Sequence, residues 1–182
     1  MNLTIGSGDI SVLLSGIQTK GYQDLFRKFV SDEKIYFNSF ASPIDALRTG
    51  AILEENYLNI LSDNYFPQWK ETCKDFSCLT SSIDFAKIEG GKITDFDELK
   101  TIYLTDFLDI IQPLSELSQE GSEQIIKKKF KNNYNQIQCQ LLCSGLKEAN
   151  LVFLSVESYD DELNILRAVS YTHLKLPTIY SV

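Results

Sequence analysis

Histidine is almost missing from this sequence of 182 residues, which contains a single one, His173. This scarcity excludes most sites that depend on imidazole, such as serine–histidine triads, cysteine–histidine pairs and zinc sites built from several histidines. Glycine and proline are also scarce, with 9 and 4 residues, while hydrophobic residues make up 43% of the chain. This composition excludes collagen-like repeats and extended disorder. If the protein is an enzyme, carboxylates, lysines and tyrosines must do the chemistry.

Positive charge is in the minority, because 17 Lys and Arg residues face 25 Asp and Glu residues and give a net charge of −8. An acidic surface argues against membrane adsorption and against nucleic-acid binding over the whole surface, but it leaves room for a local basic groove. Residues 1–16 have no basic start, and Asp9 interrupts their apolar run, so they do not form a signal peptide. No stretch has the length of a membrane span. We therefore expect a cytoplasmic protein with no membrane partner.

The four cysteines form two pairs, Cys73 with Cys78 and Cys139 with Cys143, and neither pair has the spacing of a zinc ribbon. Because Cys139 and Cys143 are four residues apart, they share one face of an expected helix. We expect them to be buried, reduced core residues. An iron–sulfur or zinc site shared by both pairs is the alternative.

Residues 169–182 look foreign to the rest of the chain. Val169 to Thr178 reads VSYTHLKLPT, which differs only at Lys175 from VSYTHLTLPT, the translation of a transposase adapter used in sequencing libraries. We interpret 169–182 as a translated adapter and exclude it from the fold; a native tail that matches by chance is the alternative. Residues 1–168 are then expected to form a single domain, truncated at its C-terminal end and free of histidine.

Hydrophobic spacing in 1–168 predicts a mixed α/β (α+β) domain. Ser42 and Pro43 are expected to start a helix that reaches about Leu61, and Gly145 is expected to end another. The expected helices cover 21–30, 42–61, 122–130 and 134–144, and the expected strands cover 79–88, 93–103 and 151–156. The first two strands should form a hairpin around Gly90 and Gly91.

This hairpin carries the strongest chemical signal. Side chains two apart on a strand share a face, so Glu98 and Lys100 point to one place. A three-residue loop at Gly90-Gly91-Lys92 would set Asp84 opposite Glu98, whereas a two-residue loop would pair Asp84 with Asp97 and turn Glu98 away.

In the first register, two carboxylates and an ammonium group converge. Carboxylate oxygens suit Mg²⁺, and the lysine could orient or help to deprotonate an attacking water. An ordinary cross-strand ion pair on a wet face is the alternative.

Asp84 followed by Glu98-x-Lys100 resembles the signature of the PD-(D/E)xK nucleases. Three further segments resemble the phage recombination exonucleases (lambda-exonuclease or YqaJ type) in the same order. They are IGSGDISVLLSG at 5–16, RTGAILE with Arg48, Gly50 and Glu54, and NQIQCQL with Gln136, Ile137 and Gln138. The resemblance covers about residues 5–160 and implies a restriction-endonuclease-like fold, a central mixed sheet flanked by helices, so that 1–168 would be a nuclease-like domain.

Carried over by position, the resemblance implies that Asp84, Glu98, Glu54 and the Leu99 carbonyl hold Mg²⁺, with Mn²⁺ as an alternative metal. Lys100 would activate or position water, and Gln136 would hold the water or the scissile phosphate. Glu55 could face the site in place of Glu54, and Gln136 and Gln138 could be plain helix-surface residues. Gly50 would serve a close backbone approach, since glycine within a helix costs up to about 1 kcal/mol relative to alanine.

DNA contacts are expected from residues at four places. The resemblance points to Ser7, Arg48 and Gln138, although Ser7 could instead cap a helix that begins near Asp9. A run of lysines, unusual in an acidic protein, offers a stripe for the DNA backbone or simply a solvated helix face; it comprises Lys127, Lys128, Lys129 and Lys131.

The resemblance implies a Mg²⁺-dependent exonuclease that degrades the 5′-ended strand at duplex DNA ends during phage recombination in a bacterial host cell. Its partners would be DNA, a single-strand annealing protein and copies of itself in a ring-shaped oligomer. A PD-(D/E)xK endonuclease or repair nuclease with another substrate is one alternative. A catalytically silent DNA-binding or scaffold domain of the same fold is another.

Overall fold

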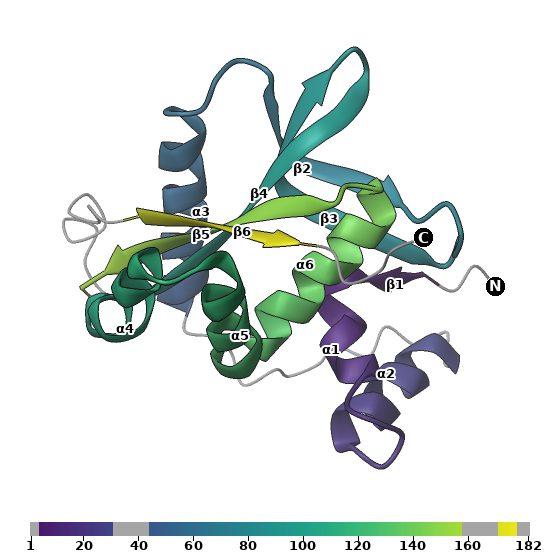
Figure 1. Ribbon diagram of the computed structural model, residues 1–182. Coiled ribbons are helices and arrows are strands. Elements are labelled where there is room, and N and C mark those ends of the chain that lie inside the picture. The colour runs from purple at the N-terminus through teal and green to yellow at the C-terminus, as the bar shows by residue number, and fades with distance from the viewer. Residues whose placement is uncertain (1–3, 31–43, 158–170, 178–182) are drawn as a thin grey trace.

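The computed structural model describes residues 4–30, 44–157 and 171–177, which fold around a six-stranded mixed sheet (Figure 1). The strands are β1 (Ile5–Gly6), β2 (Tyr65–Thr72), β3 (Leu79–Glu89), β4 (Lys92–Tyr103), β5 (Glu148–Val156) and β6 (Tyr171–Pro177). They run in the order β1-β3-β4-β5-β6, and β2 pairs with the other edge of β3. The β1–β3 and β4–β5 pairs are parallel, and the others are antiparallel.

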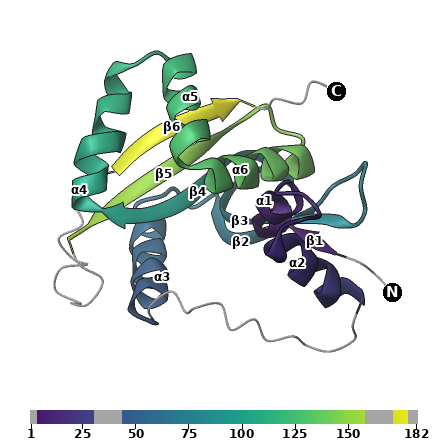
Figure 2. The same ribbon diagram turned by 90° about the horizontal axis from the view of Figure 1, so that it is seen from below.

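The helices lie on both faces of this sheet. They are α1 (Ile10–Leu13), α2 (Lys20–Val30), α3 (Ile44–Leu58), α4 (Leu104–Asp106), α5 (Gln119–Lys129) and α6 (Lys131–Ser144), with short 3-10 or π turns at Ser7–Asp9, Phe107–Ile111 and Gln112–Glu116. Figure 2 shows α3 on the side of the sheet opposite α5. This arrangement confirms the expected mixed α/β class. Among the described residues, no helix is long and apolar enough to cross a membrane.

Each face of the sheet has its own core. Side chains of β3, β4 and β5, including Ile83, Phe96 and Phe153, pack against α5 and α6, whereas Phe85, Leu99 and Val152 pack against α3. The alternation along β4 and β5 therefore buries both faces, as expected for strands covered by helices on two sides.

Local signals explain the start of α5 and the end of α6. The Ser118 side chain accepts a hydrogen bond from the Gly121 N–H and caps α5, which starts three residues before the expected position. Gly145 ends α6 in the left-handed conformation, at a φ of 74°. The expected cap at Ser42 and Pro43 lies outside the described residues.

Three of the four cysteines meet in a small third core with Leu79, and these three are Cys73, Cys139 and Cys143. All three are buried and reduced, while Cys78 is exposed. This confirms the expectation that Cys139 and Cys143 are core residues. The described part of the chain contains no group of three or more His, Cys, Asp or Glu residues that could hold a metal ion.

Candidate active site

The candidate site lies where β3 and β4 separate. One edge of β3 pairs with β1 at Leu79 and Thr80 and with β4 from Phe85 onward, which leaves the edge between them open. Side chains fill this opening: the Asp84 carboxylate accepts a hydrogen bond from the Leu99 N–H (2.8 Å), and Gln140 Nε2 donates to the Ser82 carbonyl (2.8 Å). The side chains of Asp84 and Gln140 thus satisfy two backbone groups that would have bonded to a neighbouring strand if the ladder were regular.

The hairpin register is as expected, but the loop is not. The loop contains only Gly90 and Gly91, whose φ values of 58° and 76° suit a tight two-residue hairpin turn, so the three-residue loop is wrong. Lys87 pairs with Asp95 while Ile88 pairs with Ile93, which makes Thr94 an extra residue, or β-bulge, in β4. This bulge shifts the register by one residue. The pairs beyond it, ending at Phe85 with Asp97, continue the register that sets Asp84 opposite Glu98.

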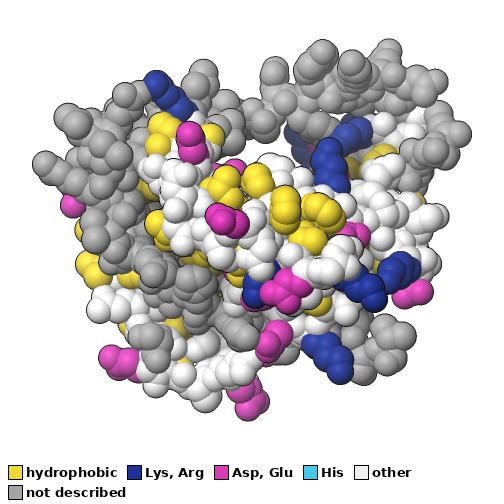
Figure 3. Space-filling model, turned by 90° about the horizontal axis from the view of Figure 1, so that it is seen from above, with side chains coloured by type: hydrophobic (Ala, Val, Ile, Leu, Met, Phe, Trp, Pro, Cys, Tyr) yellow, Lys and Arg dark blue, Asp and Glu magenta, His cyan; other side chains and the backbone are white. Residues whose placement is uncertain are grey.

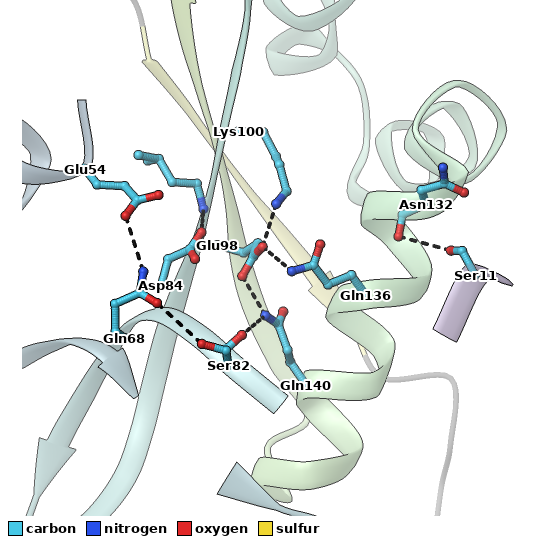
Figure 4. Close-up of polar contacts among 11 residues, drawn as sticks. Ser11, Glu54, Gln68, Ser82, Asp84, Glu98, Lys100, Asn132, Gln136 and Gln140 are labelled. Carbon is cyan, nitrogen blue, oxygen red and sulfur yellow. Dashed lines mark hydrogen bonds and ion pairs between the residues drawn. The ribbon is translucent and has the colours of Figure 1, made fainter. Parts of the chain in front are cut away.

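Glu98 is the hub of the site. Its side chain is 0% exposed, and three donors surround it (Figure 4). Lys100 Nζ and Gln136 Nε2 both lie 2.6 Å from Oε1, and Gln140 Nε2 lies 2.6 Å from Oε2. The predicted catalytic residues Glu98, Lys100 and Gln136 therefore do meet.

Burial and repulsion dominate the electrostatics of the acidic residues. Burial, aided by the neighbouring Asp84 carboxylate, raises the pKa of Glu98 to about 7, against the opposing effect of Lys100 and Gln140. Burial also raises the pKa of Asp84, although Lys100 and the Leu99 N–H oppose it. Burial would lower the pKa of Lys100, but Glu98, Asp84 and Glu54 together raise it above its usual value. Lys100 is therefore an ammonium ion at neutral pH.

Glu54, rather than Glu55, faces the site. Glu54 is half-buried on α3, and its pKa is raised by burial and by Asp84, whereas Glu55 is exposed. Gln68 Nε2 of β2 donates to Glu54 Oε2 at 3.3 Å.

One turn further along α3, the Tyr57 hydroxyl donates to buried Asp97 Oδ2 at 2.8 Å, and Asn150 Nδ2 donates to the other oxygen at 2.8 Å. Since Asp97 precedes Glu98 on β4, the buried bond from Tyr57 to Asp97 holds α3 beside the strand that carries Glu98.

The donor set fits a hard divalent cation in its chemistry. Three carboxylates of raised pKa surround a single ammonium group, an excess of negative charge that a divalent cation would relieve. The Leu99 carbonyl leaves the same edge of β4 as its N–H, toward Asp84, because both groups of a strand residue point to one side. As they stand, however, the described acidic side chains do not gather into a group of three that could hold an ion, and both Glu98 oxygens are bonded to donors.

Sequence reasoning missed Gln140, which is 0% exposed and donates to both Glu98 and Ser82. The signal was the four-residue interval from Gln136, which places both side chains on one face of α6. Gln138, the expected partner in the motif, lies about 200° around the helix from Gln136 and is buried at 4% exposure. In this structure the pair at Glu98 is therefore Gln136 with Gln140.

The expected DNA contacts Ser7 and Arg48 differ in their exposure. Ser7 is 3% exposed and caps no helix, because Gly6 and Asp9 precede the first two helical turns. Arg48 is exposed on α3. At Gly50, a Cβ added to the backbone would meet no atom of the described residues within 4 Å, so no close approach by the described part of the protein requires this glycine.

The lysine run has a local structural reason. Lys127, Lys128 and Lys129 form the last turn of α5, where cations favour the negative end of the helix dipole, and Lys127 also lies over the Tyr134 ring at 5.6 Å. Lys128 and Lys131 are exposed. On the face shown in Figure 3, the described Lys and Arg side chains are interspersed with acidic and hydrophobic ones, so that face offers no continuous basic groove.

No family model matches the chain, and no curated protein matches it by sequence. Solved structures do match. A phage-related exonuclease from Haemophilus somnus 129PT aligns with a TM-score of 0.63 at 11% identity, over 97% of this chain and 85% of its own. The alkaline exonuclease LHK-Exo from Laribacter hongkongensis aligns with a TM-score of 0.59 at 9% identity, over 96% of this chain and 77% of its own; its complex with dAMP gives the same TM-score. The described chain therefore has the fold of these exonucleases, as the motif resemblance implied.

Proposed function

We propose that the protein is a Mg²⁺-dependent deoxyribonuclease that digests duplex DNA from its ends. The observation that carries the proposal is the cluster of Glu98, Lys100, Gln136 and Asp84 at the opening between β3 and β4, in a chain that folds like two exonucleases. One of these structures holds dAMP, a nucleotide of the kind that such an enzyme would release from DNA.

In this proposal, Asp84, Glu54, Glu98 and the Leu99 carbonyl would hold Mg²⁺, or Mn²⁺ in its place. When bound, the metal would act as a Lewis acid on the phosphate and lower the pKa of a water molecule. Glu98 would have to give up one of its three donors to take part. The saturation of its oxygens is therefore the first point that a metal-binding experiment must address.

Lys100 would orient the attacking water and offset negative charge on the phosphate. Glu98, Asp84 and Glu54 raise the pKa of Lys100 against the effect of its burial, which supports a role in orienting the water rather than in deprotonating it. Gln136 would hold the water or a phosphate oxygen through its amide. The water oxygen would bond to phosphorus and release a proton to the solvent, while the bond from phosphorus to the 3′ oxygen would break and that oxygen would take a proton from the solvent. The products are a 5′-phosphate and a 3′-hydroxyl.

The test is digestion of end-labelled linear duplex with Mg²⁺ by the full chain. We expect cleavage that EDTA abolishes, with losses of at least about 100-fold for Asp84→Ala and Lys100→Ala, the scale of losing an electrostatic catalytic group. Glu54→Gln should lose activity while its exposed neighbour Glu55→Gln does not. Equal activity of the wild type and the Asp84 and Lys100 variants would refute the assignment.

Further arms test the finer parts of the proposal, namely 5′-to-3′ digestion in the cytoplasm of a phage-infected bacterium, a ring-shaped oligomer and a single-strand annealing partner. Labels at the 5′ or 3′ end report the polarity, and closed circular DNA separates an exonuclease from an endonuclease or repair nuclease. Sedimentation velocity reports the oligomer, and co-sedimentation with an annealing protein reports the partner.

A catalytically silent DNA-binding domain is the second candidate. The donors on both Glu98 oxygens favour it, because a carboxylate held in this way is not free to bind a metal ion. Calorimetry with Mg²⁺ separates the two candidates: a silent domain would bind duplex DNA but no metal.

A further inference from the structure

A chain of hydrogen bonds joins the carboxylates of Glu54 and Glu98 through residues of β2, β3 and α6 (Figure 4). Starting from Glu54 on α3, Gln68 Nε2 donates to Glu54 Oε2 at 3.3 Å, and Ser82 Oγ donates to Gln68 Oε1 at 3.5 Å. The Ser82 carbonyl accepts from Gln140 at 2.8 Å, and the same Gln140 nitrogen donates to Glu98 Oε2 at 2.6 Å. The chain thus spans from α3 through β2 and β3 to α6 and β4.

The chemistry of the neighbours fixes the orientation of both amides. Gln140 Nε2 faces a carbonyl and a carboxylate, which only accept, so its nitrogen must point to them. Gln68 Nε2 faces the carboxylate of Glu54, which leaves its oxygen for the Ser82 hydroxyl. Each step of the chain therefore has one sensible direction.

Gln68 is unusual in its backbone as well. Its φ is 52°, which makes it the one residue other than glycine with a positive φ in the described parts of the chain. The β2–β3 register pairs Pro67 with Phe85 and Trp69 with Ile83 but skips Gln68, which stands opposite Asp84. A strained conformation that persists at the edge of a site points to a role for the residue that adopts it.

We propose that Gln68 is a positioning residue, which holds the Glu54 carboxylate toward Asp84 and couples it through Ser82 and Gln140 to Glu98. The inference rests on the proposed function, since it assigns Gln68 to the arrangement of the residues that would hold the metal. Gln68 touches neither substrate nor metal in this role; it sets where Glu54 stands.

The test measures Mn²⁺ binding by the full chain, from the electron paramagnetic resonance signal of the free ion. Gln68→Ala and Gln68→Gly both remove the amide, but only glycine adopts the positive φ without strain, so the glycine variant should unfold at the higher denaturant concentration of the two. We expect both to weaken Mn²⁺ binding equally, by about fivefold, the scale of one ordinary intramolecular hydrogen bond. Gln124→Ala, on exposed α5 surface, is the control and should bind as the wild type does.

A double-substitution cycle separates positioning from a general structural effect. In a Glu54→Gln background, Gln68→Ala should cause no further loss of Mn²⁺ affinity, because its effect passes through Glu54. A further fivefold loss there, or a Gln68→Gly variant that binds as the wild type does while Gln68→Ala does not, would overturn the proposal.

The outcomes also separate this inference from the proposed function. A wild type that cleaves DNA, with Gln68→Ala binding Mn²⁺ as tightly, overturns the positioning role alone. A wild type that shows the expected cycle but never cleaves DNA refutes the nuclease and keeps the positioning role. A wild type that binds no Mn²⁺ overturns both.

Discussion

Glu98 should make the metal-free protein less stable as the pH rises, and Glu98→Gln should remove this dependence. The carboxyl is 0% exposed, and burial together with Asp84 raises its pKa from the ordinary value of 4.5 to about 7. Between those values the folded protein keeps a proton on Glu98 that the unfolded chain releases. Stability therefore falls as the pH rises through this window, because the unfolded state binds fewer protons.

The two pKa values set the size of the effect. A shift from 4.5 to about 7 corresponds to about 3 kcal/mol over the full range, at about 1.4 kcal/mol per pH unit. Between pH 5 and pH 8 the same linkage gives a loss of about 2 to 3 kcal/mol from this group. Urea unfolding in EDTA at a series of pH values, for the wild type and for Glu98→Gln, measures it as the change in the difference between the two proteins.

Groups remote from Glu98 titrate alike in both proteins and cancel in that difference. We expect the wild type to lose about 2 to 3 kcal/mol relative to Glu98→Gln between pH 5 and pH 8. Parallel stability curves, with a difference that stays constant with pH, would refute the reasoning. They would mean that Glu98 ionises as it does in water, and that Lys100, Gln136 and Gln140 offset its burial fully.

Three further predictions follow from single contacts. Gln140→Leu should destabilise the protein by about 1–3 kcal/mol in urea unfolding, because the Ser82 carbonyl and Glu98 each lose a donor; an unchanged midpoint would contradict this. Tyr57→Phe should cost about 1–2 kcal/mol, since buried Asp97 loses the hydroxyl at 2.8 Å, and it should weaken Mn²⁺ binding by loosening the helix that carries Glu54; a loss of stability without any change in binding would show that α3 needs no such anchor. Gly50→Ala should raise stability by up to about 1 kcal/mol, because the helix there has room for a methyl group; destabilisation would mean that the backbone at Gly50 is approached more closely than it is here.

The hairpin shows how far sequence patterns can lead. Alternation along 79–88 and 93–103 predicted both strands. The resemblance to the PD-(D/E)xK nucleases favoured the register in which Asp84, Glu98 and Lys100 meet. The loop length was predicted wrongly, because nothing in the residues around Thr94 marks a bulge. A two-residue loop with one extra residue in β4 gives the same register as a three-residue loop with a regular strand. The register thus depends on the turn at the two glycines and on the bulge at Thr94, and only the glycines are visible in the sequence.

The remaining site residues depend on geometry that one sequence does not contain. The β2 strand was not expected from the sequence, yet β2 supplies Gln68. The motif directed attention to Gln136 and Gln138, two residues apart, although a helix brings together residues four apart. Glu54 was separated from Glu55 only by the burial of α3 against the sheet.

The strand pairing of 171–177 does not decide whether residues 169–182 are native to the protein. We propose that they are translated adapter, although 171–177 form β6 and pair with β5 from Glu148 to Leu154. An open sheet edge offers a row of backbone donors and acceptors, and YTHLKLP contains several residues that favour strands, so such a segment would pair there whatever its origin.

Amplification of the source DNA without adapters should therefore read a different sequence after Ala168, and the same codons there would refute the proposal. Replacing 171–177 with a Gly-Ser segment of equal length tests the physical part of the argument. Because that segment pairs poorly, the edge of β5 should open and the protein should self-associate at lower concentrations in light scattering. If association stayed as in the unaltered chain, β6 would not be what protects this edge.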